Sequence, residues 1–153
     1  MNWLTARVPD RAVSTGILLL RLMVGAAFIL HGLPKMQNPT GWMNEMPNAP
    51  PGFLQATGAL IEVVGGILLM GGLFTRVATA MLACQMLAAL ALVHIPHGDP
   101  FVAMGRPSAE LACAYLAVSL LLTATGPGEW SFDAILFNHE TARSPAPSPA
   151  PIM

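Results

Sequence analysis

Charged residues are scarce in this sequence. Asp, Glu, Lys and Arg make up 10% of its 153 residues, whereas soluble domains carry roughly 25%. Hydrophobic residues account for 54%, and so few charges cannot cover a surface that faces water. The formal net charge of −1 also excludes the basic surface typical of nucleic-acid binding, so no nucleic-acid partner is expected.

Cysteine is scarce as well. The two cysteines, Cys84 and Cys113, lie inside apolar runs, which excludes both a disulfide scaffold and a spaced zinc motif. They are expected at different depths and therefore as free thiols. The sequence also lacks a haem-ligand pair, iron–sulfur spacing and a flavin fingerprint, so the chain is not expected to transfer electrons alone.

Four long apolar segments are what the sequence has instead. They cover residues 14–34, 52–74, 76–94 and 107–125. Each is close to the ~20 residues that an α-helix needs to cross the hydrocarbon core. They show no alternation of apolar and polar residues, which argues against a β-barrel. The pattern predicts an all-α integral membrane protein in which the four segments form a four-helix bundle.

The rest of the chain is assigned around these segments. Residues 1–13 are expected to form a cytoplasmic segment, residues 14–138 the membrane domain, and residues 139–153 a disordered tail rich in Pro and Ala. Within the membrane domain, residues 129–137 predict a short amphipathic helix on the surface. Residues 74–76 predict a tight turn that makes the second and third spans an antiparallel hairpin.

Basic residues near the span ends predict the orientation. One side carries Arg7, Arg11, Arg76 and Arg143, whereas the other carries Lys35 and Arg106. The positive-inside rule then places both termini in the cytoplasm. The first span resembles a signal peptide, but Arg21 interrupts it and no clear cleavage site follows, so we expect it to be retained.

An inner polar layer is expected from Arg21, Glu62 and Gln85. Arg21 is placed about two turns from the cytoplasmic end of its span, and the other two near the middle of theirs. A charged side chain at the bilayer centre costs at least ~2.5 kcal/mol, so such residues usually face the bundle and are paired. We therefore expect Arg21 to pair with Glu62. Two interpretations remain open: a buried ion pair that fixes helix register, and a site that handles protons or a ligand.

A second polar group is expected at the outward end of the bundle. It contains His31, Lys35, His94, His97 and Glu110. His31 and Lys35 are four residues apart and share one helix face. Such a group can be a hydrated rim or a proton relay. His94, His97 and Glu110 are also weak metal-ligand candidates, but His-x-x-His at a helix end is an unspecific motif, so no metal is predicted.

Three stretches of the sequence resemble the DoxX family. LLLRLMVGAAFILHGLPKM resembles the start of that family, GALIEVVGGILLMGGLFTRVAT its second segment, and TGPGEWSFD its closing Gly-Pro-Gly turn with Ser-x-Asp. The resemblance covers about residues 14–135. It implies a small four-helix protein of the cell inner membrane. Some relatives are linked to quinone-dependent oxidation of sulfur compounds, and others to enzymes of thiol and oxidative-stress defence.

Three functions are compatible with these observations. The first is a redox-linked membrane subunit that holds a quinone between its helices, through Arg21, Glu62 and Gln85, while a soluble partner does the electron chemistry. The second is a non-catalytic scaffold or assembly protein that binds a protein partner or forms a homo-oligomer. The third is a small proton-coupled transporter. The resemblance favours the first, and all three place the chain among membrane lipids.

Overall fold

The computed structural model describes residues 11–46 and 49–141, and every regular element in those ranges is helical. The elements are α1 (Arg11–Lys35), α2 (Gly52–Gly71), α3 (Thr75–Ala89), the π-helical turn η1 (Leu90–His94), α4 (Ile95–His97), α5 (Glu110–Thr125) and α6 (Phe132–Thr141). The fold is therefore all-α, as predicted. The predicted segment 1–13 and tail 139–153 lie mostly outside the described residues, and α6 continues to Thr141.

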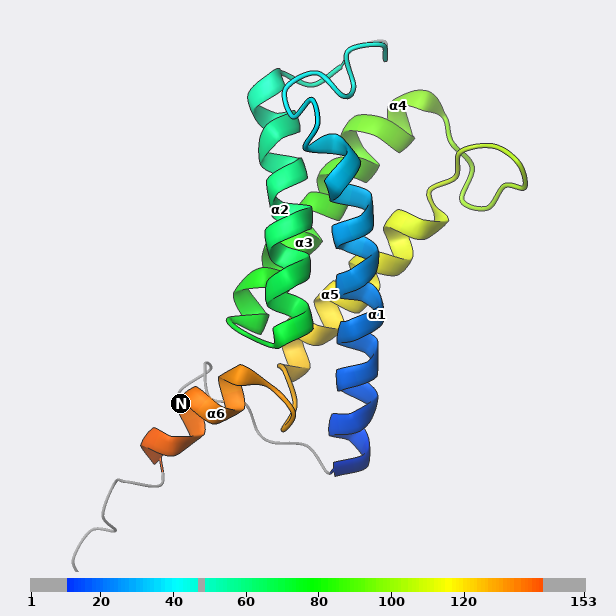
Figure 1. Ribbon diagram of the computed structural model, residues 1–153. Helices are drawn as coiled ribbons and strands as arrows, with labels where there is room; N and C mark the ends of the chain where they lie inside the picture. The colour runs from blue at the N-terminus through cyan, green and yellow to red at the C-terminus, as the bar shows by residue number, and fades with distance from the viewer. Residues whose placement is uncertain (1–10, 47–48, 142–153) are drawn as a thin grey trace, which may run out of the picture.

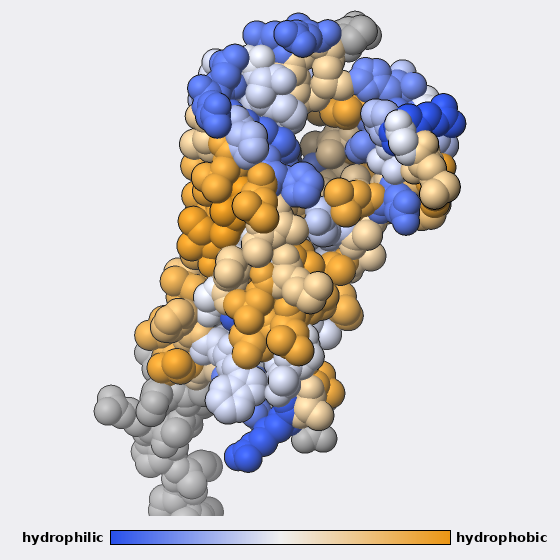
Figure 2. All heavy atoms as spheres, turned by 45° about the vertical axis from the view of Figure 1, so that its right-hand side comes forward, coloured by the Kyte–Doolittle hydropathy of each residue, from blue (hydrophilic) through white to orange (hydrophobic). Residues whose placement is uncertain are grey.

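Three helical segments are long and apolar enough to cross a membrane. They are α1 with 25 residues, α2 with 20 residues, and the continuous segment Thr75–His97 with 23 residues. Their outward faces carry exposed Leu, Ile, Val, Phe and Met side chains, and Figure 2 shows these as a broad hydrophobic zone below a hydrophilic end. The chain is a multi-pass membrane protein. The fourth segment, α5, is apolar but has 16 residues and begins three residues after the predicted start.

The two ends of the molecule differ in what they contain (Figure 1). At the upper end, here called the Lys35 end, lie the end of α1, the start of α2, and α4. At the lower end, here called the Arg21 end, lie the turn between α2 and α3, the end of α5, and α6. The described polar contacts divide between these two ends.

Glycines fix how α1 lies against α2. A Cβ on Gly25 would stand 2.8 Å from the carbonyl oxygen of Gly66, and a Cβ on Gly66 would stand 2.7 Å from that of Gly25. The two backbones are thus in direct contact, as small residues allow between helices in lipid. Further along, a Cβ on Gly32 would stand 3.0 Å from the Cβ of Glu62. This antiparallel register sets which charged groups can meet.

The interior is filled by apolar side chains from all four long helices. They are Ile17, Val24 and Phe28 from α1, Leu69 from α2, Leu82 and Met86 from α3, and Ala112 and Leu122 from α5. α3 packs against both α2 and α5. The helices α1, α2, α3 and α5 thus share one core.

Two breaks in the helices have local causes. α2 ends in a Schellman motif, with Gly72 left-handed at φ 67° and the Leu73 amide donating to the Leu68 carbonyl, so the predicted tight hairpin is present. The third span continues past its predicted end through η1. Pro96 has no N–H to donate to the carbonyl four residues earlier, and the helix widens into one π turn just before it.

Candidate functional site

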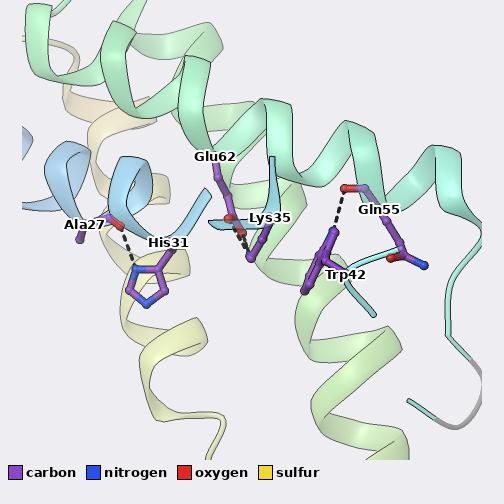
Figure 3. Close-up of polar contacts among 6 residues, drawn as sticks. All are labelled: Ala27, His31, Lys35, Trp42, Gln55 and Glu62. Carbon is purple, nitrogen blue, oxygen red and sulfur yellow. Dashed lines mark hydrogen bonds and ion pairs between the residues drawn. The ribbon is translucent and has the colours of Figure 1, made fainter. Parts of the chain in front are cut away.

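Lys35 and Glu62 form an ion pair at the Lys35 end. The Lys35 Nζ lies 2.6 Å from both carboxylate oxygens of Glu62 (Figure 3). Glu62 comes from the middle of α2 and its side chain is 4% exposed, whereas that of Lys35 is 21% exposed. The pair therefore joins a buried carboxylate to an ammonium group that can still be reached.

The predicted pair between Arg21 and Glu62 is wrong. Gly32 is the residue of α1 that faces Glu62. Arg21 precedes Gly32 by eleven residues, which is about 16 Å along a helix. This separation is beyond the reach of an arginine side chain, so Glu62 meets Lys35 instead. Glu62 belongs with the group expected at the outward end rather than with Arg21.

Trp42 covers the other side of the ammonium group. Its ring centroid lies 4.5 Å from Lys35 Nζ, within the range of a cation–π contact. In Figure 3 Lys35 stands between Glu62 and Trp42. The Trp42 indole Nε1 donates to the backbone oxygen of Gln55 at 3.3 Å. The aromatic ring thus helps to form the wall of the site.

Gln55 holds the loop that carries Trp42. Its Oε1 accepts from the Met43 amide at 2.9 Å, and its Nε2 donates to the Pro50 oxygen at 2.8 Å and to Asn44 Oδ1 at 3.1 Å. The sequence analysis did not identify Gln55 as a site residue. An amide one turn into an apolar helix, just after a loop rich in Pro and Asn, was the available signal.

Gln85 and His31 approach the same region from other helices. A Cβ on Gly58, one turn from Glu62 on α2, would stand 2.6 Å from Gln85 Nε2. The His31 Nδ1 lies 2.8 Å from the Ala27 carbonyl oxygen, to which it donates as the N–H tautomer, and this leaves Nε2 free. His31 thus lies one turn from Lys35 on α1, and Gln85 lies against α2 one turn from Glu62.

Tyr115 brings α5 to this group, and the sequence analysis missed it. Its ring lies edge-on to His31, with centroids 6.1 Å apart, and it packs against Phe28 at 4.9 Å. It is the chain's one tyrosine, and its place inside an apolar segment was the signal available in the sequence.

The other predicted outward residues are not brought together. His94 Nδ1 lies 2.8 Å from Asp99 Oδ2, which closes the turn after α4. His97 and Glu110 are exposed, and their side chains make no hydrogen bond or ion pair within the part of the chain that the structure describes. Among the residues that the structure describes, no three or more His, Cys, Asp or Glu side chains are placed to bind a metal together. Cys84 and Cys113 are free thiols.

Arg21 is buried at the opposite end among backbone carbonyls. It is 1% exposed. Its Nε donates to Leu69 and its Nη2 to Met70, at 2.9 and 3.0 Å, while Nη1 donates to Pro127 and Trp130 at 2.8 and 2.9 Å. The last carbonyls of a helix lack partners within it and carry partial negative charge. Arg21 thus ties the end of α2 to the turn after α5.

Asp133 completes this cluster from α6. Its carboxylate accepts from the amides of Phe74 and Thr75 at 2.7 and 2.9 Å, which caps the N-terminus of α3. Its own amide donates to the Gly72 carbonyl at 2.9 Å. Ser131 Oγ accepts from the Ala134 amide and caps α6. These contacts make the Arg21 end a structural clamp and leave the Lys35 end as the candidate site.

Comparison with known proteins places the chain in a family. A model of the DoxX family matches residues 16–95. A Bacillus subtilis protein named "Putative oxidoreductase CatD" is 32% identical over 84% of this chain and 92% of its own length. A Mycobacterium tuberculosis protein named "Uncharacterized membrane protein Rv3486" is 28% identical over 82% of this chain and 84% of its own length. An uncharacterized Haemophilus influenzae protein is 33% identical over 77% of this chain and 88% of its own length.

No solved structure matches the chain at a significant level. The family model covers more than half of the sequence, and the Bacillus subtilis relative aligns along nearly its whole length. This protein therefore belongs to the DoxX family.

Proposed function

We propose that this protein is a redox-linked membrane subunit that binds the head group of a quinone at the Lys35–Glu62 pair. The observation that carries the proposal is this ion pair, with both carboxylate oxygens 2.6 Å from one ammonium group. Charged residues at membrane depth are rare and mark ligand or proton sites. The partial exposure of Lys35, beside the face of Trp42, gives a ligand access to the ammonium group.

The chemistry of these side chains suits a quinone. The Lys35 ammonium can donate a hydrogen bond to a quinone carbonyl, and the ring can stack beside Trp42. Reduction of a quinone to a quinol takes up two electrons and two protons. Carboxylate and imidazole side chains, such as those of Glu62 and His31, are the groups that most often act as general acids and bases in proteins. The isoprenoid tail would lie along the apolar outer faces of the helices.

The electrons are proposed to come from a soluble partner protein. The sequence contains no motif for a haem, an iron–sulfur cluster or a flavin. The name of the Bacillus subtilis relative contains the word oxidoreductase, which supports a redox role. A homo-oligomer or a separate protein can supply the partner surface, and crosslinking in native membranes distinguishes the two.

The proposal is tested with protein purified in mild detergent. Lipids are extracted for mass spectrometry, and the thermal midpoint is measured with and without added quinone. We expect a co-purifying quinone and an upward thermal shift for the natural protein. Both should be lost in Lys35→Met and retained in Glu110→Gln, the control at an exposed carboxylate. The absence of quinone and of any shift, or an equal shift in Lys35→Met, would overturn the proposal.

We also propose that α5 makes a fourth crossing and that both termini face the cytoplasm across the cell inner membrane. The helix spans about 24 Å, against ~30 Å for the hydrocarbon core, so the chain on either side must complete the crossing. A single cysteine is introduced at Glu45 or at Glu129 in a Cys84→Ser/Cys113→Ser background. An impermeant maleimide should label Glu45→Cys in intact cells and Glu129→Cys only after permeabilisation. Labelling of both from one side would contradict the fourth crossing, and the reverse pattern would contradict the orientation.

A further inference from the structure

A row of hydroxyl groups lies between α3 and α5, outside the candidate site. Thr79 and Thr123 face each other, with their Oγ1 atoms 2.9 Å apart. Thr75 lies one turn before Thr79 on α3, and Ser119 lies one turn before Thr123 on α5. Because α3 runs toward the Lys35 end and α5 runs away from it, the order along the bundle is Thr75, the facing pair, then Ser119.

The row lies between a carboxylate at one end of the bundle and a tyrosine and a histidine nearer the other end. At the Arg21 end, the Thr75 amide donates to the Asp133 carboxylate at 2.9 Å. At the Lys35 end, Tyr115 lies one turn beyond Ser119 on the same face of α5. Its ring meets that of His31, which lies one turn before Lys35 on α1. The hydroxyls therefore lie between Asp133 and the candidate site.

Two of these hydroxyls are buried without a protein partner. Thr75 and Ser119 are 0% and 1% exposed, and neither Thr75 Oγ1 nor Ser119 Oγ makes a hydrogen bond to a described protein atom. Buried hydroxyls in proteins almost always have a partner. An ordered water molecule is the usual partner where protein groups do not supply one. The two orphaned hydroxyls mark polar positions on either side of the Thr79–Thr123 pair.

The facing pair can donate in more than one direction. Thr79 Oγ1 lies 2.8 Å from the Thr75 carbonyl oxygen, and Thr123 Oγ1 lies 2.8 Å from the Ser119 carbonyl oxygen. Each hydroxyl has one hydrogen and accepts through its lone pairs. Each threonine can therefore donate either to its own helix or to the other threonine, and rotation about the C–O bond exchanges the two arrangements.

We propose that this hydroxyl row, with internal water beside Thr75 and Ser119, conducts protons between the Arg21 end and the Lys35–Glu62 site. In each step an oxygen accepts a proton from one neighbour and releases its own proton to the next. Rotation of the hydroxyls then restores the starting arrangement. One proton has then crossed the row, and each oxygen again carries one hydrogen. The path goes beyond quinone binding and does not depend on it.

Proton flux into liposomes tests the path. Purified protein is reconstituted into quinone-free liposomes containing a pH-sensitive dye, and valinomycin with a potassium gradient supplies the potential. We expect acidification faster than in protein-free liposomes and several-fold slower in Thr123→Val and Ser119→Ala. Thr125→Val is the matched control, because Thr125 makes the same bond to its own helix, to the Leu121 oxygen, but is exposed. Its flux should equal that of the natural protein.

Two results would overturn the path. One is a flux no greater than that of protein-free liposomes, and the other is an equal flux in Thr123→Val and Thr125→Val. Water-edited solid-state NMR in lipid provides a second measurement. The amides of Thr75 and Ser119 should receive magnetisation from water, and no transfer to either would exclude internal water. Proton flux without quinone binding would contradict only the quinone proposal. Quinone binding without proton flux would contradict only the proton path.

Discussion

Lys35 holds Glu62 through both carboxylate oxygens, and this contact joins the last turn of α1 to the middle of α2. Two charges removed from water are tolerated because each neutralises the other and both Glu62 oxygens accept a hydrogen bond. Trp42 lies over another side of the ammonium group, which stays partly exposed. The same contact thus stabilises the fold and presents a charged group to a ligand.

Removal of one partner of this pair should cost more than removal of both. Lys35→Met leaves the buried Glu62 carboxylate without its counterion, which typically costs about 3–5 kcal/mol. The double variant Lys35→Met/Glu62→Leu leaves no unpaired charge and should be clearly more stable than Lys35→Met. Unfolding in mixed detergent–SDS micelles measures both. Equal loss in the single and double variants would show that the two residues do not stabilise each other.

Arg21→Lys should be strongly destabilising although the charge is kept. The guanidinium donates from three nitrogens to four carbonyls on two segments. Lysine has one nitrogen with three donors and lacks this planar geometry. At least one carbonyl loses its charged donor, so we expect a loss of at least about 1.5 kcal/mol. A thermal midpoint equal to that of the natural protein would contradict the structural role.

Arg21 and Glu62 should behave as independent sites. Because the structure places them at different levels of the bundle, the effects of Arg21→Ala and Glu62→Ala on the free energy of unfolding should add within about 0.5 kcal/mol. The same micelle assay on the two single variants and the double variant measures this. A double variant more stable than Arg21→Ala alone would restore the pairing that the sequence suggested.

The sequence predicted the helices well because their signals are local. An apolar run bounded by Gly or Pro fixes a helix within a few residues, and the second and third predicted spans lie close to α2 and Thr75–His97. The partners of the charged residues depend on how far one helix slides along another. That register comes from the contact of Gly25 with Gly66, which no spacing within α1 alone reveals.

The clamp at the Arg21 end was hidden for another reason. Arg21 binds carbonyl oxygens, which every residue has, so its partners leave no trace in the sequence. The closing Ser-x-Asp motif was recognisable as a pattern, but its role follows only once α6 folds back and places Asp133 at the start of α3. Of the residues around the Lys35 end, His31 and Lys35 were expected there, whereas Glu62 and Gln85 were expected in the inner layer with Arg21.

Asp133→Ala should loosen the start of α3. The carboxylate caps the Phe74 and Thr75 amides, and loss of a helix cap costs about 0.5–2 kcal/mol. Hydrogen exchange at these two amides should become faster, while Asp133→Asn, which keeps one acceptor oxygen, should have a smaller effect. Glu45→Ala, on an exposed loop residue, is the control for loss of a carboxylate. Unchanged exchange in Asp133→Ala would argue against the cap.

Gly72→Ala should be the most damaging of three glycine substitutions. Gly72 has φ 67°, and a Cβ there would overlap Arg21 Nη2 and stand 2.7 Å from the Ser131 Cβ. Gly98 has the same φ of 67° but open space around it, so Gly98→Ala measures the cost of left-handed backbone alone, about 1–2 kcal/mol. Gly16 lies within α1 with nothing within 4 Å, so Gly16→Ala should stabilise the helix by roughly 0.5–1 kcal/mol.

The difference between Gly72→Ala and Gly98→Ala reports the contacts that a Cβ at residue 72 makes with Arg21 and Ser131. Because the guanidinium is fixed by four carbonyls, it cannot move away from a new methyl group without loss of hydrogen bonds. Gly72→Ala should therefore lower the free energy of unfolding by clearly more than Gly98→Ala. In an Arg21→Ala background only the conflict with the Ser131 Cβ, 2.7 Å from the new Cβ, remains, so the difference between the two glycine substitutions should become clearly smaller. A Gly72→Ala effect that does not depend on Arg21 would mean that the guanidinium does not occupy this position.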